Sequence, residues 1–306
     1  ITGSNGLLGQ KLVKHCLKSQ IPFIATSKGE NRNSFCPSTQ YAELDIRDDR
    51  SIATLFAKER PTHVIHTAAI TNVDHCEEQP DLCQSVNVDA VQKLFNACIK
   101  IQAHFQLLST DFVFDGEKGN YDEEDAVHPL SVYAKSKVDA ELILINNASK
   151  NWSIVRTIIV YGEGENLSRG NIVVWAKETL QAGKSMTIVD DQFRAPTWAD
   201  DLAWACLRIC ELNQTGLFHI SGPETFSVYE LVCRIADHFS CDKSLVTAIS
   251  SSTLNQAARR PPRKRAAGLG QGWRPGRAPL LGTGGCLAGG RRDRGRSQRR
   301  PRRRHA

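Results

Sequence analysis

The first 160 residues alternate short, β-branched apolar runs with longer segments of helical periodicity. The strand-like runs include "FIATS", "HVIHTAA", "FQLLSTDFVF" and "WSIVRTIIVYG", and "VDAVQKLFNACIKI" is one of the helical segments between them. This alternation is typical of βαβ units, in which a helix connects two parallel strands. The chain is therefore expected to fold as an α/β protein around a parallel sheet.

A glycine motif, "TGSNGLLG", directly precedes the helical pattern "LLGQKLVKHCL". Glycines spaced three residues apart at a strand-to-helix turn let backbone N–H groups approach a pyrophosphate at the helix N-terminus. Because the motif follows Ile1 immediately, the first strand is expected to be truncated. We predict a dinucleotide site with contacts from Gly3, Asn5, Gly6, Leu7, Leu8 and Gly9.

The end of the second strand indicates which dinucleotide binds. Folds of this kind that bind NAD often carry an acid there, whereas this chain has Thr26, Ser27 and Lys28. Lys28 and Arg32 are suited to a 2′-phosphate. We therefore predict NADPH as the cofactor, with NADH as the alternative, and Ser27, Lys28 and Arg32 among the binding residues.

A candidate catalytic group lies in "STDFVFDG" and "SVYAKSK". Tyr133 and Lys137 are four residues apart and share one face of a helix. An ammonium group near a phenol lowers the pKa of the phenol and makes it a usable acid or base. Thr110 follows a strand, at the sheet edge where ligands bind, and is placed to hydrogen-bond the substrate oxygen that Tyr133 protonates.

Residues 259–306 differ sharply in composition from the rest of the chain. They hold 15 Arg and one Lys against a single acid, a net charge of +15, so that the total of +6 leaves −9 on residues 1–258. An acidic body does not support a nucleic-acid surface. The tail, residues 264–306, is expected to be disordered. Two origins stay open: a basic RNA-binding or localisation tail, and out-of-frame translation, which we favour.

Ten scattered cysteines without a paired framework predict reduced thiols and a cytoplasmic protein. Cys206 and Cys210, one helical turn apart, are expected to be core residues, and no metal site is predicted. No apolar run approaches the roughly 18 residues that span a bilayer, which predicts no membrane segment. Thr197 and Ser227 are the expected N-caps of two later helices.

Six motifs occur in this order along the chain: "TGSNGLLG", "LDIRD", "RPTHVIHTAAITNVDHCE", "VN", "STDFVFDG" and "YAKSK". Together they resemble the extended short-chain dehydrogenase/reductases, specifically the dTDP-4-dehydrorhamnose reductase family, from residue 1 to about 263. The resemblance implies a Rossmann-type, doubly wound parallel sheet with a smaller C-terminal substrate lobe. The expected domains are residues 1–160, with a return at about 196–222, and an incomplete lobe over residues 161–263.

The resemblance also implies an NADPH-dependent reductase of a 4-keto sugar nucleotide in dTDP-rhamnose biosynthesis, with Thr110, Tyr133 and Lys137 as catalytic residues. It places Asp45 and Ile46 near the adenine and Ala68 and Ala69 along the cofactor. By the same resemblance Tyr133 and Lys137 are also expected to contact the cofactor, and a homodimer stays open.

Asp111 is expected at the sugar by the same resemblance. Sugar-nucleotide dehydratases that resemble this fold carry an Asp-Glu pair after the strand-end threonine, whereas this chain has Asp111 and Phe112, which disfavours elimination. Arg194 is suited either to a diphosphate or to a surface salt bridge. Two other functions remain open: a non-catalytic, NADP-binding regulatory subunit that resembles the methionine adenosyltransferase β subunit, and a sugar-nucleotide epimerase.

Overall fold

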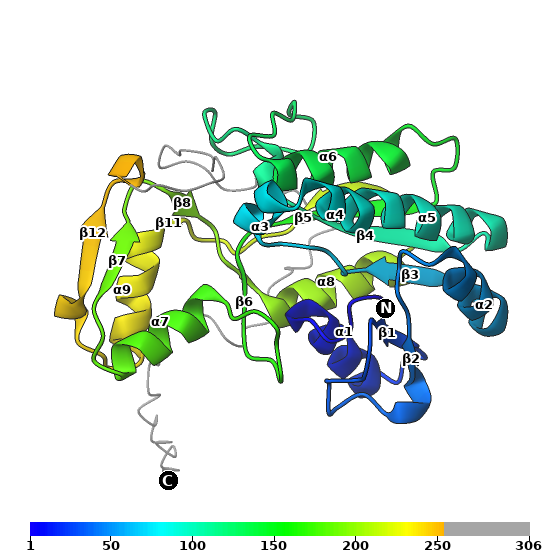
Figure 1. Ribbon diagram of the computed structural model, residues 1–306, viewed down its shortest axis with the longest axis horizontal. Coiled ribbons are helices and arrows are strands. Elements are labelled where there is room, and N and C mark those ends of the chain that lie inside the picture. The colour runs from blue at the N-terminus through cyan, green and yellow to red at the C-terminus, as the bar shows by residue number, and fades with distance from the viewer. Residues whose placement is uncertain (254–306) are drawn as a thin grey trace, which may run out of the picture.

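The computed structural model describes residues 1–253, and the predicted disordered tail lies outside these residues (Figure 1). A parallel sheet forms the centre of the larger part of the molecule. Its strands run in the order β2, β1, β3, β4, β5, β10, and Thr2 bridges Thr26 of β1 and His66 of β3. The strands are β1 (Ala25–Ser27), β2 (Tyr41–Glu43), β3 (His63–His66), β4 (His104–Thr110), β5 (Trp152–Thr157) and β10 (Gly216–His219).

Helices cover both faces of this sheet (Figure 1). On one face α1 packs against α8, and on the other α2, α5 and α6 pack side by side. This arrangement confirms the predicted doubly wound α/β fold. The helices of this part are α1 (Leu7–Lys18), α2 (Asp49–Glu59), α3 (Val73–Glu78), α4 (Pro80–Gln84), α5 (Ala90–Ile101), α6 (Val132–Ile145) and α8 (Ala199–Glu211).

A smaller lobe with its own apolar core lies beside the sheet (Figure 1). In it β7 pairs with β12 in parallel, β8 pairs with β11 in antiparallel, and α7 packs on α9. A short pair, β6 (Val160–Tyr161) and β9 (Thr197–Trp198), lies between the two parts. The lobe elements are α7 (Ile172–Gln181), β7 (Met186–Val189), β8 (Phe193–Arg194), β11 (Phe226–Ser227), α9 (Val228–His238) and β12 (Val246–Ile249).

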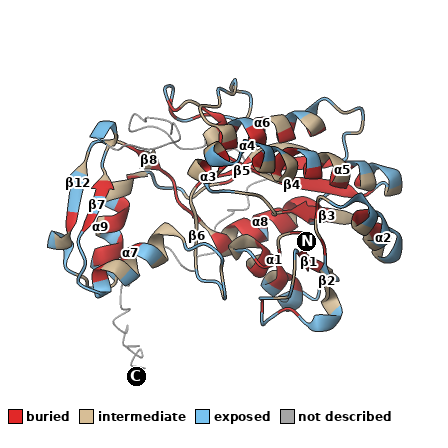
Figure 2. Cartoon of the chain, viewed as in Figure 1, coloured by how far each residue is buried: buried red, intermediate tan, exposed pale blue. Residues whose placement is uncertain are grey.

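The central strands and the inner helix faces supply most of the buried residues (Figure 2). Phe95 of α5 and Phe105 and Leu107 of β4 are fully buried in the core between the sheet and α2, α5 and α6. Each large apolar side chain buried in this way contributes about 1.5–3 kcal/mol to stability. The same core contains Ala140 and Leu144 of α6, so it packs β4 directly against that helix.

Side-chain caps explain where several helices begin. Ser227 forms a capping box with Glu230 at the start of α9, as predicted. The predicted cap at Thr197 is wrong, because Trp198 is the N-cap of α8. The hydroxyl of Thr197 instead donates at 2.8 Å to the carbonyl of Ile158, which lies between β5 and β6. Within residues 1–253 we find no helix with the length and apolar content that a bilayer span requires.

Candidate active site

The carboxyl end of β4 carries the predicted catalytic threonine. Thr110 is buried, and its hydroxyl donates to Oδ1 of Asp111 at 3.1 Å while accepting the backbone N–H of Phe112 at 3.2 Å. These bonds turn the chain sharply out of the sheet and leave both polar side chains at its carboxyl edge. This is the edge at which open parallel sheets bind ligands.

Helix α6 brings the tyrosine to this edge. Ser131 caps the helix by accepting the N–H of Ala134, so Tyr133 lies in the first turn. Its ring packs against Val73 and Cys76 and meets Phe112 edge-on at a centroid distance of 6.0 Å. The Thr110 side chain is close enough to lower the pKa of the phenol. The structure therefore brings Thr110 and Tyr133 together, as the motif spacing predicts.

The phenol of Tyr133 is buried, and burial is the main cause that raises its pKa above the usual value. The Asp111 charge raises this pKa further, whereas the Thr110 side chain and the charge of Arg169 lower it. The predicted low pKa of Tyr133 is therefore wrong for this structure. The reason is geometric: the Lys137 Nζ donates to the carbonyl oxygen of Leu108 at 2.7 Å, and no hydrogen bond joins it to Tyr133 within residues 1–253.

Lys137 is itself a buried cation. Burial lowers its pKa to about 8, and the charges of Glu141 and Cys83 oppose that shift. Its amino group therefore remains largely protonated at neutral pH, but its pKa is much closer to 7 than that of an exposed lysine. A positive charge is thus held within one helical turn of a phenol that keeps its proton.

The glycine motif forms a turn that other residues would not fit. Gly3 has φ +70°, and a Cβ on it would lie 2.7 Å from the backbone nitrogen of Ala68. A Cβ on Gly9 would lie 2.3 Å from the carbonyl oxygen of Gly3. Gly6 is the N-cap of α1 and has no side chain to occupy the first-turn amides. The turn thus fits the pyrophosphate of a dinucleotide.

Hydrogen bonds among three of the predicted cofactor residues, Asn5, Ser27 and Arg32, support the turn from within. The backbone N–H of Asn5 donates to the hydroxyl of Ser27 at 3.0 Å, and Nδ2 of Asn5 donates to the carbonyl of Glu30 at 2.8 Å. Oδ1 of Asn5 accepts the backbone N–H of Arg32 at 2.9 Å. These bonds hold the loop after β1 against the glycine turn.

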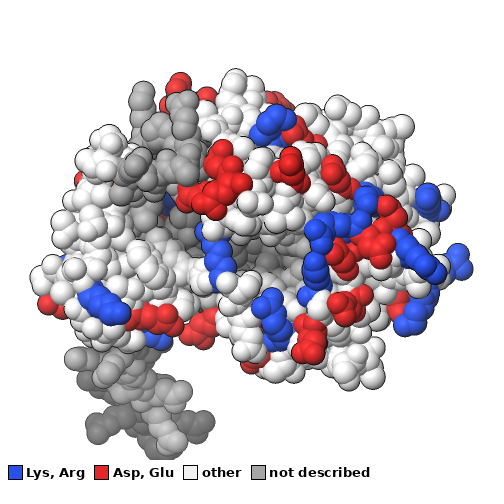
Figure 3. Space-filling view, in the orientation of Figure 1, with Lys and Arg blue, Asp and Glu red and all other residues white. Residues whose placement is uncertain are grey.

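Lys28 and Asp45, two of the predicted cofactor residues, form a partly exposed charge cluster with Arg47. Lys28 Nζ lies 3.2 Å from Oδ2 of Asp45, and Arg47 binds the same carboxylate through Nε and Nη2. The two hydrogen-bonded cations hold the pKa of Asp45 well below its usual value. Figure 3 shows basic side chains on the rim of a hollow near the middle of the viewed face, with acidic side chains beside them.

The remaining cofactor predictions fall on two segments that follow strands. Ala68 and Ala69 follow β3, and the backbone of Ala68 lies directly beneath Gly3. Ile46 follows β2 and is buried in the core with Val64. All of them lie near the carboxyl ends of their strands, where the glycine turn lies too.

Residues 1–266 match the family model described as the RmlD substrate binding domain. The chain belongs to this family. It is 32% identical over 276 residues to a dTDP-4-dehydrorhamnose reductase of Aggregatibacter actinomycetemcomitans, with 85% of this chain and 87% of the relative covered. It is 31% identical over 264 residues to methionine adenosyltransferase 2 subunit beta of Rattus norvegicus, with 85% of this chain and 77% of the relative covered.

Solved structures of RmlD-type proteins share the fold. A dTDP-4-dehydrorhamnose reductase of Bacillus anthracis, solved in complex with NADP, is 25% identical and superposes with a TM-score of 0.71 over 85% of this chain and 86% of the other. The predicted membership of the rhamnose reductase group within the extended short-chain dehydrogenase/reductases is thereby confirmed.

Arg194, predicted to meet either a diphosphate or a surface partner, is not on the surface. It is 3% exposed, and Nη1 donates to the carbonyl of Phe193 at 2.8 Å. Its guanidinium lies 5.7 Å from the centroid of the Phe112 ring, which in turn meets Tyr133. Arg194 of the smaller lobe is therefore linked to Tyr133 of α6 through the Phe112 ring.

Two residues near the site were not predicted from the sequence. Asn87 donates through Nδ2 to the hydroxyl of Ser136 at 3.1 Å and accepts the backbone N–H of Ile70 at 2.8 Å. Asn87 thus connects α6 to the segment after β3. In the sequence it is the Asn of the motif "VN", which could have drawn attention to it. Arg169, whose charge acts on Tyr133, donates to the hydroxyl of Thr71 at 3.2 Å.

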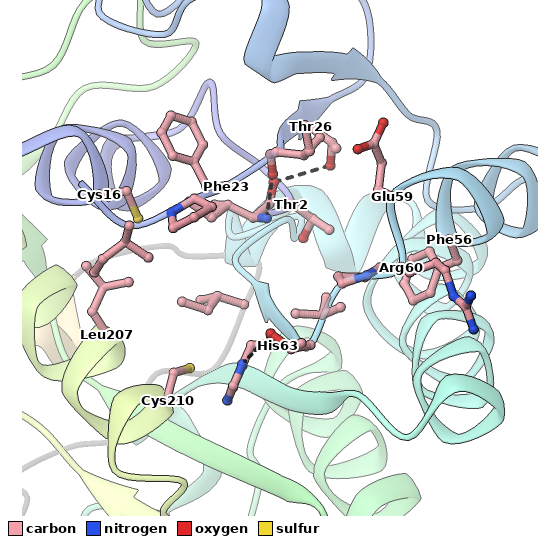
Figure 4. A pocket seen from close by; sticks show the side chains of 18 of the residues that line it. Thr2, Cys16, Phe23, Thr26, Phe56, Glu59, Arg60, His63, Leu207 and Cys210 are labelled. Atoms are coloured by element: carbon pink, nitrogen blue, oxygen red, sulfur yellow. Dashed lines mark hydrogen bonds between the residues drawn. The ribbon is translucent and has the colours of Figure 1, made fainter. Parts of the chain in front are cut away.

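A cavity of about 610 Å³ lies at the opposite edge of the sheet, near the amino ends of β1 and β3. Cys16, Phe23 and Leu207 line one side of it, and Phe56 and Arg60 the other (Figure 4). None of the predicted catalytic residues lines it. Its walls are mostly apolar, and it is separate from the candidate active site.

Proposed function

We propose that this chain reduces a 4-keto sugar nucleotide with NADPH, as a dTDP-4-dehydrorhamnose reductase does. The observation that carries the proposal is the convergence of Thr110, Tyr133 and Lys137 at the carboxyl edge of the sheet. The glycine turn that begins α1 lies at the same edge. The name of the relative from A. actinomycetemcomitans supports the substrate class.

Side chains of the protein supply the proton and polarise the carbonyl group of the substrate. NADPH supplies the hydride for the keto carbon. The Tyr133 hydroxyl donates its proton to the carbonyl oxygen of the substrate, and its raised pKa keeps that proton in place until hydride transfer begins. The Thr110 hydroxyl hydrogen-bonds the same oxygen. The Lys137 ammonium stabilises the phenolate that remains and binds the cofactor ribose.

The cofactor and substrate contacts are part of the proposal. Lys28 and Arg32 bind the 2′-phosphate, which accounts for NADPH over NADH, and the NADP bound to the B. anthracis reductase supports this choice. Asp111 binds the sugar, and Arg194 binds the diphosphate. We also place the reaction in the cytoplasm, which is supported by nine cysteines of residues 1–253 that are all free thiols.

The test is NADPH oxidation by the purified chain with dTDP-4-dehydrorhamnose, measured at the nicotinamide absorbance. Tyr133→Phe removes the donated proton and is expected to lower kcat by about 10²–10⁴-fold with NADPH affinity retained. Tyr229→Phe, in the lobe helix α9, is the matched control and should keep wild-type turnover. Full turnover by Tyr133→Phe would reject the assignment of the proton donor.

A second candidate function rests on the relative from R. norvegicus, a methionine adenosyltransferase subunit of comparable identity. In that case the chain would bind NADP and a synthetase partner without reducing a sugar. Co-purification with a methionine adenosyltransferase catalytic subunit, together with NADPH binding and no keto-sugar turnover, would favour it. Fold alone does not separate the two functions.

A further inference from the structure

A row of polar residues crosses the sheet directly beneath α6. Ser109 of β4 is paired with Arg156 of β5, and Arg156 is paired with His219 of β10. Residues paired across neighbouring strands point to the same face of a sheet. Glu141 of α6 lies over this row, one helical turn after Lys137.

Glu141 binds two members of the row. Its Oε1 accepts the hydroxyl of Ser109 at 2.5 Å and Nε of Arg156 at 3.0 Å. Its Oε2 accepts Nη2 of Arg156 at 2.6 Å. The carboxylate is thus bound in a bidentate manner by a guanidinium, the geometry that most restricts both groups.

The rest of the row completes the network. The Arg156 Nη1 lies 3.4 Å from Nε2 of His219, whose Nδ1 lies 3.3 Å from the carbonyl oxygen of Tyr121. Burial and the Arg156 charge lower the pKa of His219 to about 4, so the imidazole is neutral at pH 7. A neutral ring with its proton on Nδ1 satisfies both contacts. Glu141 and Arg156 are 1% and 3% exposed, so the ion pair is closed off from water.

This network touches the catalytic groups through the backbone of β4. Ser109 lies between Thr110 and Leu108, whose carbonyl accepts the Lys137 ammonium. We propose that Glu141 is a positioning residue, which holds Lys137 and the carboxyl end of β4 in register through Ser109 and Arg156. The inference rests on the proposed function for its kinetic consequences, but the positioning of Lys137 itself is measurable without a substrate.

The network also has an electrostatic consequence for Lys137. The charged and titratable groups that act on or face its ammonium come from three elements: Glu141 on α6, Cys83 on α4 and His66 on β3. His66 is neutral at pH 7, because burial and the Lys137 charge lower its pKa to about 3. Glu141 is the largest cause that raises the pKa of Lys137 against burial. Removing the carboxylate should therefore move the Lys137 titration to lower pH.

The experiment compares three variants of the full chain. In Glu141→Gln/Arg156→Gln both buried charges are removed together, so that neither is left unpaired. Ser109→Ala removes the bond to β4 and keeps the ion pair. Asp139→Asn is the matched control, since Asp139 lies on the same helix but pairs with exposed Lys135.

Two readouts are measured for each variant: the Lys137 titration by NMR with ¹³Cε-labelled lysine, and kcat and KM in the NADPH assay. The double variant should lower the Lys137 midpoint, because it removes the carboxylate that raises the pKa of Lys137. It and Ser109→Ala should lower kcat by roughly 10- to 100-fold, the size of effect expected from a displaced catalytic group, with little change in the KM for NADPH. Ser109→Ala should leave the midpoint unchanged, and Asp139→Asn should change neither readout.

The outcomes separate this inference from the proposed function. A double variant with a wild-type Lys137 midpoint overturns the positioning role, and so does wild-type kcat in both the double variant and Ser109→Ala. A shifted midpoint in a chain whose wild type shows no keto-sugar turnover supports the positioning role and rejects the proposed reaction. If the double variant does not fold, a wild-type kcat in Ser109→Ala overturns the role and a reduced kcat with an unchanged midpoint supports it.

Discussion

The glycine turn yields the sharpest prediction, because the chain contains glycines that separate two kinds of constraint. Gly9 of α1 is restricted by space: a Cβ would lie 2.3 Å from the Gly3 carbonyl oxygen and 2.6 Å from the Ser4 Cα. Gly183, after α7, is restricted by its backbone alone, since its φ is +67° and nothing lies within 4 Å of its Cβ position. Gly9→Ala and Gly183→Ala therefore test the two constraints separately.

The expected magnitudes differ between stability and binding. Gly183→Ala should cost about 1–2 kcal/mol for the left-handed conformation, offset by about 0.4–1 kcal/mol from the less flexible unfolded chain, with no effect on NADPH. Gly9→Ala gains about 1 kcal/mol of helix propensity but loses about 1–3 kcal/mol to overpacking. Relief of the contact must shift the Gly3 carbonyl, so NADPH affinity should fall by roughly 10-fold or more, since a buried backbone contact to a charged group contributes about 1.5–3 kcal/mol.

Urea unfolding followed by circular dichroism gives the stability of each variant, and NADPH fluorescence enhancement gives the dissociation constant. The two variants should separate: Gly183→Ala loses stability and binds normally, whereas Gly9→Ala binds weakly. Wild-type NADPH affinity in a folded Gly9→Ala protein would show that the turn is not the pyrophosphate site.

The remaining predictions concern cofactor choice and acid stability. Lys28→Ala should weaken NADPH binding by about 10-fold, the effect of one charge-assisted hydrogen bond, and leave NADH binding unchanged. Lys58→Ala, on α2, is the control, and an equal loss for both cofactors would contradict the 2′-phosphate assignment. Acid should destabilise the protein through His219, because its pKa is lowered from 6.5 to about 4 in the folded state, so the unfolded chain takes up the proton first. Stability should fall by about 3 kcal/mol as pH drops from 6.5 to 4, and His219→Gln should flatten this slope in urea unfolding at several pH values; equal slopes would contradict the assignment.

Local features were readable from the sequence because their geometry depends on short spacings. The helical period places Tyr133 and Lys137 on one face of α6, and the glycine motif determines the turn before α1. The capping box of Ser227 follows from a three-residue spacing in the same way. The alternation of strand and helix patterns predicted the parallel sheet, and the family resemblance added that it is doubly wound. Membership of the RmlD family followed from the order of the motifs.

Two predictions from local sequence patterns were wrong, because the side chains concerned bind groups on other elements of the fold. Thr197 has the composition of a cap, but its hydroxyl is taken by the carbonyl of Ile158, 39 residues away. The ammonium of Lys137 is on the correct helix face, but it donates to the strand carbonyl of Leu108 and makes no hydrogen bond to Tyr133 within residues 1–253. In both cases a buried polar group took the nearest unsatisfied partner, which lay on another element.

By itself, the sequence determined the class of fold, the glycine turn and the residues of the candidate catalytic group, because these depend on periodicity and spacing within single elements. Only the tertiary structure decided the network of Ser109, Glu141, Arg156 and His219, whose members are 15 to 63 residues apart where they bind one another. Strand register and helix packing bring such residues together, and neither can be predicted from a short sequence pattern. The burial that makes their charges matter is likewise a property of the folded molecule alone.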